Sequence, residues 1–142
     1  DYEEIYRSVD SYLENHLKLQ EYLDVAAGDV SKIYRFPGGS NNSICERETM
    51  HSIIEELDER GYEHIDWNVT SGDASGKNLS SEKLVENVLE RSEGLEHAVI
   101  LFHDNKYKNE TVEALPEVIE ELRERGYRFE TVDEAPDVSL LD

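Results

Sequence analysis

The sequence predicts an α/β fold in which parallel strands alternate with helices, and two observations carry this prediction. The first is a short apolar run from Ala98 to Phe102, which is rich in β-branched residues and stops at His103 and Asp104. Such a run is typical of a strand that is buried on both faces. The second is the alternation of helical and strand patterns along the chain. Strands separated by helices pair in parallel, because each helix returns the chain to the same end of the sheet.

Apolar periodicity and turn residues predict where each element lies. The expected helices span residues 4–23, 43–61 and 111–125, and a further helix begins at Ser80 or Ser81. The expected strands span residues 33–36, 64–69, 98–104 and 127–132.

Three residues predict how these helices begin and end. Ser43 is followed three residues later by Glu46, which predicts a capping box at the start of the second helix. Gly61 is expected to end that helix in a left-handed conformation. Pro116 is expected in the first turn of the last helix, because a proline deeper in a helix costs about 3 kcal/mol.

Composition excludes several classes of partner. The net charge is −20, from 34 acidic and 14 basic residues, so a nucleic-acid partner or an anionic membrane surface is disfavoured. No apolar run approaches the roughly 18 residues that a membrane span needs. Cys45 is the single cysteine, which excludes an internal disulfide and a thiolate metal cluster.

Three polar residues follow the carboxyl ends of successive expected strands or stand just beyond them. They are Arg35, Asp73 and His103. Since the carboxyl ends of parallel strands lie at one edge of a sheet, where α/β proteins build their sites, we expect the three side chains to converge. Strand alternation also places Leu101 on the same face as His103. The simpler interpretation of Asp73 is turn chemistry within Ser-Gly-Asp.

Three stretches resemble the third, fourth and fifth motifs of the polysaccharide deacetylases, metal-dependent carbohydrate esterases that include peptidoglycan and chitin deacetylases. They are Arg35 to Asn41 (Arg-Phe-Pro-Gly-Gly-Ser-Asn), Asp66 to Asp73, and Leu101 to Asp104. The resemblance extends from Tyr2 to about Val132. It implies a partial (β/α) barrel, a single truncated domain over residues 1–142, a glycan substrate such as peptidoglycan, and a location in the cell envelope or outside the cell.

The resemblance also implies roles for individual residues. His103 would be the general acid that protonates the leaving amine, Asp73 would tune it, and Arg35 would orient the catalytic base. The substrate pocket would be lined by Leu101, Trp67, Pro37, Gly38 and Gly39.

The fourth motif leaves two alignments open. The family usually has Trp after the motif aspartate, but Ala74 follows Asp73 here, so Trp67 could fill the acetyl pocket instead. If Asp66 and Trp67 are the motif pair, Asp73 is only a turn residue. We favour Asp73.

The family's first two motifs, Thr-Phe-Asp-Asp-Gly and His-Ser/Thr-x-x-His, do not occur in this sequence. They supply the catalytic base and the metal ligands, and the remaining histidines 16, 51, 64 and 97 lack metal-ligand spacing. We therefore expect the chain to begin just after the metal-binding part. Alone it should bind no metal or other cofactor and be inactive, whereas the complete family enzyme would use a zinc-type divalent metal.

Three functional classes follow. The first is the carboxyl-terminal portion of a polysaccharide N-deacetylase, and the second is a non-catalytic relative that binds glycans or a partner. The third, a small α/β signalling module, is least favoured, because an acidic pair after the first strand is missing. A truncated barrel also has open strand edges, which could be covered by a second copy in a homo-oligomer, by the terminal segments, or by rearrangement into an open α/β sheet.

Overall fold

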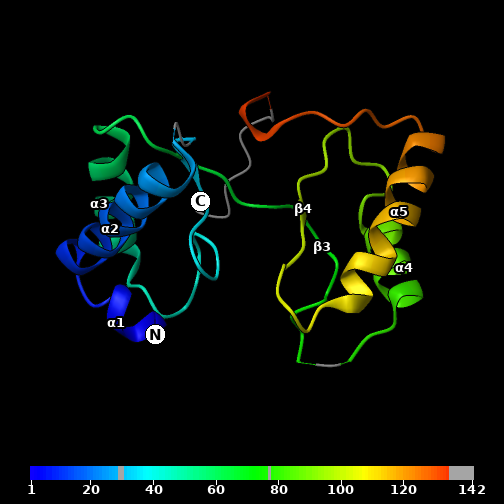
Figure 1. The fold of residues 1–142 in the computed structure, drawn as a ribbon, viewed down its shortest axis with the longest axis horizontal. Coiled ribbons are helices and arrows are strands. Elements are labelled where there is room, and N and C mark those ends of the chain that lie inside the picture. The colour runs from blue at the N-terminus through cyan, green and yellow to red at the C-terminus, as the bar shows by residue number, and fades with distance from the viewer. Residues whose placement is uncertain (29–30, 77, 135–142) are drawn as a thin grey trace. The chain divides into compact units, whose positions relative to one another are not determined.

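The computed structural model describes residues 1–28, 31–76 and 78–134, and its residues group into two compact units. The amino-terminal unit holds the described residues up to Asp66, and the carboxyl-terminal unit holds those from Trp67 onward. Each unit contains one pair of short parallel strands with helices beside it (Figure 1). That the two units act as one domain stays a prediction.

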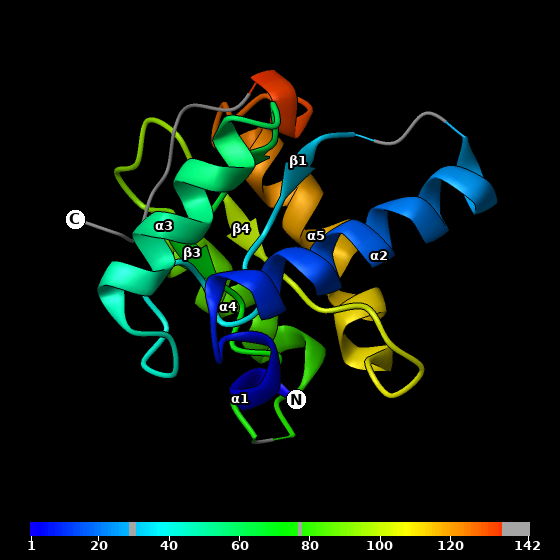
Figure 2. The same ribbon diagram turned by 90° about the vertical axis from the view of Figure 1, so that its left-hand side faces the viewer.

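The amino-terminal unit packs two helices beside its strand pair. Helices α2 and α3 lie side by side (Figure 1, Figure 2), and β1 and β2 pair with Ile33 opposite Glu63. Its elements are α1 (Tyr2–Ile5), α2 (Val9–Ala27), β1 (Ile33–Tyr34), α3 (Arg47–Asp58) and β2 (Glu63–His64).

The core of this unit is rich in aromatic rings. Tyr12 packs between Tyr6 and Phe36, with ring centroids 5.3 and 5.2 Å away, and Phe36 is fully buried. His16 joins the cluster edge-on to Tyr34, at 5.0 Å between centroids. Among the described residues, the buried ring nitrogens His16 Nε2 and His64 Nε2 lack a hydrogen-bond partner. The cluster therefore surrounds its imidazoles with rings and leaves those nitrogens without polar partners.

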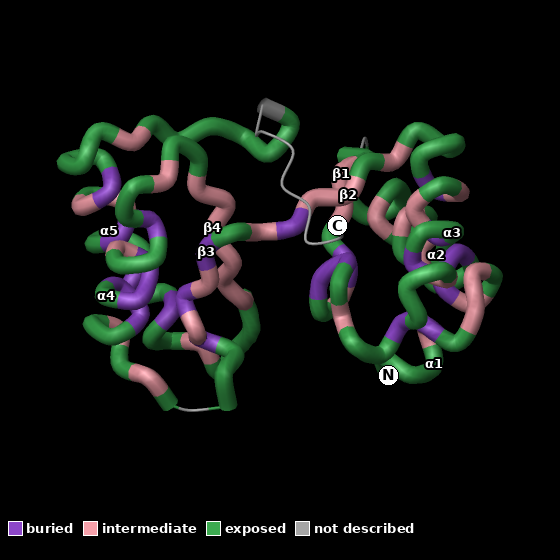
Figure 3. Tube along the Cα trace, turned by 180° about the vertical axis from the view of Figure 1, so that it is seen from behind, coloured by how far each residue is buried: buried purple, intermediate pink, exposed green. Residues whose placement is uncertain are grey.

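The carboxyl-terminal unit packs two amphipathic helices on its strand pair. Helices α4 and α5 contact each other along their length, and Figure 3 shows buried positions on both of them and on β3. The strands pair with Val69 opposite Ile100 and Thr70 opposite Leu101. Its elements are β3 (Val69–Thr70), α4 (Ser81–Arg91), β4 (Ile100–Leu101), α5 (Asn109–Glu124) and the 3₁₀ helix η1 (Val132–Glu134). Its buried apolar core consists of Val69, Leu84, Val85, Val88, Ala114, Val118 and Leu122.

All four predicted strands differ in the structure, and the expected strand 33–36 is shortened to Ile33–Tyr34. The expected strand 64–69 is two strands, β2 and β3, which belong to different sheets. The expected strand 98–104 is reduced to Ile100–Leu101, which is half-buried where burial on both faces was predicted. Residues 127–131 form no strand. There the Tyr127 N–H donates to the Leu122 carbonyl, so the chain is still closing helix α5.

One of the predicted helix starts is confirmed, and two are wrong. Ser80 is the N-cap of α4, as expected, and accepts from the Lys83 N–H. The capping box at Ser43 was wrong, because α3 begins only at Arg47. The side chain of Asn42 instead takes the nearby donors: its Oδ1 accepts from the N–H groups of residues 44 and 45, at 3.1 and 3.0 Å. The first expected helix, 4–23, is divided into α1 and α2 because Ser8 caps a new start.

No helix in the described ranges combines the length and the apolar character that crossing a bilayer would require.

Pro116 lies well inside a helix, contrary to the sequence-based prediction. Helix α5 begins at Asn109, which makes Pro116 its eighth residue, and the proline ring is exposed. A proline at this depth has no N–H for the carbonyl four residues earlier, that of Val112. Helix α5 therefore tolerates a local defect on its solvent side while Ala114 and Val118 stay packed in the core.

We expect Pro116→Ala to raise the free energy of unfolding of the carboxyl-terminal unit by about 1–3 kcal/mol, because it restores the helical hydrogen bond. Urea unfolding followed by the fluorescence of Trp67, the single tryptophan, measures this. The neighbouring exposed Glu117→Ala is the control and should change stability by less than about 0.5 kcal/mol. A Pro116→Ala chain no more stable than the parent would contradict the prediction.

Candidate functional site

Asp73 and His103 form a hydrogen-bonded pair in the carboxyl-terminal unit. The imidazole Nδ1 of His103 lies 2.8 Å from Asp73 Oδ1, and the His103 backbone N–H donates to Asp73 Oδ2 at 2.8 Å. The aspartate side chain is 2% exposed and the histidine side chain 32% exposed. A buried carboxylate thus binds one ring nitrogen of an imidazole that is still partly exposed to solvent.

The register of the strand pair explains this meeting. Thr70 lies opposite Leu101 in the parallel pair, so both chains run to the same edge of the sheet. Asp73 follows three residues after Thr70, and His103 follows two residues after Leu101. Parallel pairing therefore delivers residues 30 positions apart to one place.

The turn that carries Asp73 is held by the neighbouring strand and helix. The Ser71 N–H and hydroxyl both donate to the Leu101 carbonyl, at 3.3 and 3.1 Å, and the Asn87 amide donates to the Ser71 carbonyl at 2.8 Å. Gly72 has φ +85°, and a Cβ there would lie 3.2 Å from the Asn87 amide nitrogen. Only glycine combines this backbone conformation with so close a neighbour.

Two residues that the sequence analysis did not single out for the site also hold Asp73. The Thr111 hydroxyl donates to Asp73 Oδ2 at 3.1 Å, and the Lys108 ammonium donates to the Asp73 backbone carbonyl. Both come from the start of helix α5. The sequence offers one weak signal for them, namely that they follow the fifth motif within a few residues.

These contacts set the acidity of Asp73. Burial alone would raise the pKa of its carboxyl group, but hydrogen bonds from the His103 side chain and backbone and from Thr111 outweigh burial. The pKa of Asp73 is therefore lower than usual, and the group is a carboxylate at neutral pH.

In the amino-terminal unit, the glycine-rich loop after β1 is anchored from two sides. The Tyr6 hydroxyl donates to the Pro37 carbonyl at 2.8 Å. Asp66, which is 1% exposed, accepts from the Ser40 N–H at 3.0 Å and also from the Ser40 hydroxyl. Gly38, with φ +82°, has the Asn42 side chain 3.2 Å from where a Cβ would stand. Asp66 thus has a structural contact of its own, separate from Asp73.

The remaining predicted site residues are placed as follows. Arg35 is exposed and donates to the Phe36 carbonyl at 3.2 Å. Trp67 and Leu101 are half-buried in the carboxyl-terminal unit. The structure brings together Asp73 and His103, whereas Arg35 belongs to the other unit, so its convergence with the pair stays a prediction.

The described residues do not fit a metal site. In residues 1–28, 31–76 and 78–134, no three side chains of histidine, cysteine, aspartate or glutamate lie close enough together to share an ion. The Asp73–His103 pair offers two such groups, with the facing nitrogen already used in the hydrogen bond. We therefore assign no metal chemistry to these residues.

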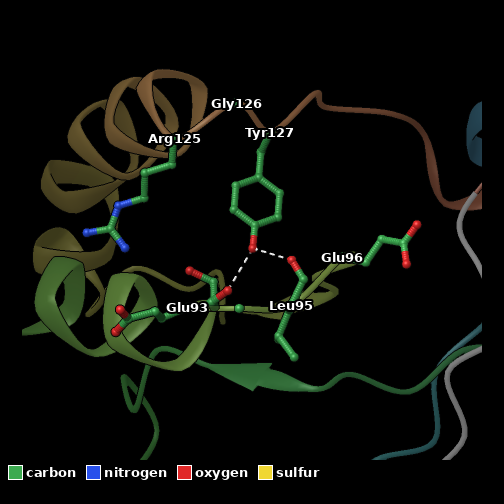
Figure 4. Close-up of a pocket in the computed structure, with 8 residues that line it drawn as sticks. Glu93, Leu95, Glu96, Arg125, Gly126 and Tyr127 are labelled. Carbon is green, nitrogen blue, oxygen red and sulfur yellow. Dashed lines mark hydrogen bonds between the residues drawn. The ribbon is translucent and has the colours of Figure 1, made fainter.

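A surface hollow of about 560 Å³ lies elsewhere in the carboxyl-terminal unit. Figure 4 shows the Tyr127 ring reaching into it, with the hydroxyl 2.6 Å from the Leu95 carbonyl and 2.7 Å from that of Ser92. Glu93 and Arg125 also line it, but none of the predicted site residues does. The hollow is lined by the residues that come just after α4 and α5, and we assign it no role in the site.

We expect Asp73→Asn to flatten the dependence of stability on pH below about pH 4, near the usual pKa of an aspartate. The folded-state pKa of Asp73 is lower than the unfolded one, so its stabilising effect is complete above the unfolded value and is lost as pH falls through the folded value. Urea unfolding between pH 7 and pH 2 measures this, with exposed Asp104→Asn as the control. Equal pH dependence in parent and Asp73→Asn chains would refute it.

We expect Ser40→Ala to destabilise the amino-terminal unit by about 1–3 kcal/mol, because the buried Asp66 carboxylate loses a hydroxyl donor. Thermal or urea unfolding followed by tyrosine signals measures the change. Exposed Ser43→Ala in the same loop is the matched control and should stay within about 0.5 kcal/mol of the parent. The idea fails if both variants behave alike.

Comparison with known proteins gives consistent results. No family model matches the chain. The chain is 32% identical over 130 residues to YheN of Bacillus subtilis, named as a candidate polysaccharide deacetylase, covering 87% of this chain and 42% of that protein. It is 28% identical over 103 residues to the peptidoglycan-N-acetylglucosamine deacetylase of Bacillus cereus, covering 72% and 44%. The chain thus spans less than half the length of these relatives.

The fold gives the same result. The crystal structure of the catalytic domain of peptidoglycan N-acetylglucosamine deacetylase from Eubacterium rectale superposes with a TM-score of 0.87 at 28% identity, covering 100% of this chain and 66% of that one. The predicted partial α/β fold of the deacetylase type is confirmed. Its sequence relatives and this structural neighbour are named as polysaccharide or peptidoglycan deacetylases, so the predicted resemblance to the polysaccharide deacetylase family is confirmed.

Proposed function

We propose that the chain supplies the general-acid half of a polysaccharide N-deacetylase, an enzyme that hydrolyses acetamide groups on N-acetylglucosamine polymers such as peptidoglycan. The observation that carries the proposal is the Asp73–His103 pair, a buried carboxylate 2.8 Å from the Nδ1 of a partly exposed histidine. A histidine held in this way is the usual general acid for breaking a bond to nitrogen.

The chemistry follows from which nitrogen is occupied. Asp73 Oδ1 accepts from His103 Nδ1–H, so Nε2 is the nitrogen available to substrate. When the imidazole is protonated, Nε2 carries the proton to be transferred. As the carbonyl carbon–nitrogen bond breaks, that proton moves to the leaving amine nitrogen, and the bonding electron pair stays with the nitrogen. The neutral imidazole that remains keeps its Nδ1–H on Asp73.

Other residues complete the proposed site. Leu101, two residues before His103, would line the pocket for the acetyl methyl group together with Trp67. The loop Pro37, Gly38 and Gly39 would admit the sugar chain because its glycines add no side chains. Arg35 would orient the catalytic base. The family motifs that supply this base and the metal ligands do not occur in this sequence.

The relatives' names support the substrate class, since one of them is a peptidoglycan-N-acetylglucosamine deacetylase. We extend this to a glycan partner and to a location in the cell envelope or outside the cell, where such a polymer is found. The strands β1–β2 and β3–β4 form sheets of two strands each among the described residues. A homo-oligomer that covers their outer edges remains part of the proposal.

We expect the 142-residue chain, given N-acetylglucosamine oligomers and added zinc, to release no acetate. The product of the complete reading frame should release it, and His103→Ala there should lower kcat by about 10²–10⁴-fold. His51→Ala, at an exposed position of α3, is the control. Turnover by the 142 residues alone, or a His103→Ala enzyme of full activity, would overturn the assignment. If the complete product binds oligomers without turnover, the non-catalytic relative is correct.

A further inference from the structure

We propose that Thr111 is a positioning residue for the general acid: its hydroxyl holds the Asp73 carboxylate so that Oδ1 faces His103 Nδ1 and Nε2 is left for the substrate. The inference deepens the proposed function and rests on it for its catalytic meaning. Its structural content concerns the Asp73–His103 pair alone.

The hydrogen bonds divide cleanly between the two carboxylate oxygens of Asp73. Oδ2 accepts two donors, the Thr111 hydroxyl at 3.1 Å and the His103 backbone N–H at 2.8 Å. Oδ1 accepts from the imidazole Nδ1–H, with 2.8 Å between oxygen and nitrogen. Two of these three donors belong to His103 itself, so the Thr111 hydroxyl is the donor that ties the carboxylate to a different segment of the chain and limits its rotation about the Cβ–Cγ bond.

Burial makes the Thr111 hydroxyl effective in this role. Thr111 is 5% exposed, so water cannot readily replace its hydroxyl as a donor to Asp73. Its place in the first turn of α5 fixes its backbone. Lys108, the N-cap residue of the same helix, donates to the Asp73 backbone carbonyl and so holds the other end of the residue.

The consequence is a choice of tautomer. A neutral imidazole carries its proton on either nitrogen, and the hydrogen bond made by one nitrogen decides which. With Asp73 fixed, the proton belongs on Nδ1. If the carboxylate turns, this preference weakens, and the Nε2–H form, which cannot accept a proton at Nε2, becomes more populated.

The test measures that tautomer ratio in the ¹⁵N-labelled 142-residue chain, at a pH where imidazoles are neutral, from the nitrogen chemical shifts of His103. Thr111→Val removes the hydroxyl and keeps the shape. It should raise the ratio of Nε2–H to Nδ1–H by about threefold or more, as expected when a charge-assisted hydrogen bond is lost. Thr111→Ser, which restores the hydroxyl, should match the parent chain.

Thr131→Val, at an exposed position, controls for introducing valine and should leave the ratio unchanged. A folded Thr111→Val chain with the parent ratio overturns the proposal. If that variant does not fold, the parent chain decides. A slowly exchanging Thr111 hydroxyl proton close to the His103 amide proton supports the proposal. A hydroxyl that bonds instead to the Tyr107 carbonyl one helical turn back refutes it.

This outcome is independent of the deacetylase assay. A tautomer ratio that responds to Thr111→Val in a protein without acetate release would leave the positioning role intact and remove the proposed function. An active enzyme with an unresponsive ratio would do the reverse.

Discussion

The site in the carboxyl-terminal unit depends on the hydrogen bonds that the Asp73 carboxylate accepts. It is almost fully buried, so its charge must be matched by donors rather than by water. Those donors belong to His103, which follows β4, and to Thr111, in the first turn of α5. They lie 30 and 38 residues after Asp73 in the sequence. The carboxylate thus joins three segments, and the same bonds that stabilise it orient His103.

The amino-terminal unit also contains a buried, hydrogen-bonded carboxylate, but this one anchors a loop. Asp66 is also a buried carboxylate, and it accepts from both the backbone N–H and the hydroxyl of Ser40. That arrangement anchors a glycine-rich loop. The two aspartates that competed for the fourth-motif position therefore have distinguishable structures. Asp73 contacts the histidine, and Asp66 contacts the loop.

Sequence patterns predicted what depends on local order and missed what depends on distant neighbours. The apolar spacing of Leu84, Val85 and Val88 identified the buried face of α4. The prediction of one strand over 64–69 was wrong, because Asp66 in its middle accepts hydrogen bonds from Ser40, 26 residues earlier. Residues 127–132 have a strand-like sequence pattern, but the Tyr127 N–H donates to the Leu122 carbonyl at the end of helix α5. Thr111 could not be identified, since its role depends on a carboxylate 38 residues earlier.

The aromatic cluster of the amino-terminal unit has a consequence for behaviour in acid. His16 sits among rings with Nε2 unpartnered, and burial lowers its pKa below the ordinary 6.5. Protonation is easier after unfolding, so this unit loses stability once the medium becomes mildly acidic. In the other unit, the pKa of Asp73 lies below its ordinary 3.8, so the stabilising effect of this carboxylate is lost only in more strongly acidic medium. As the pH falls, the contribution of His16 to the first unit should therefore be lost before the contribution of Asp73 to the other.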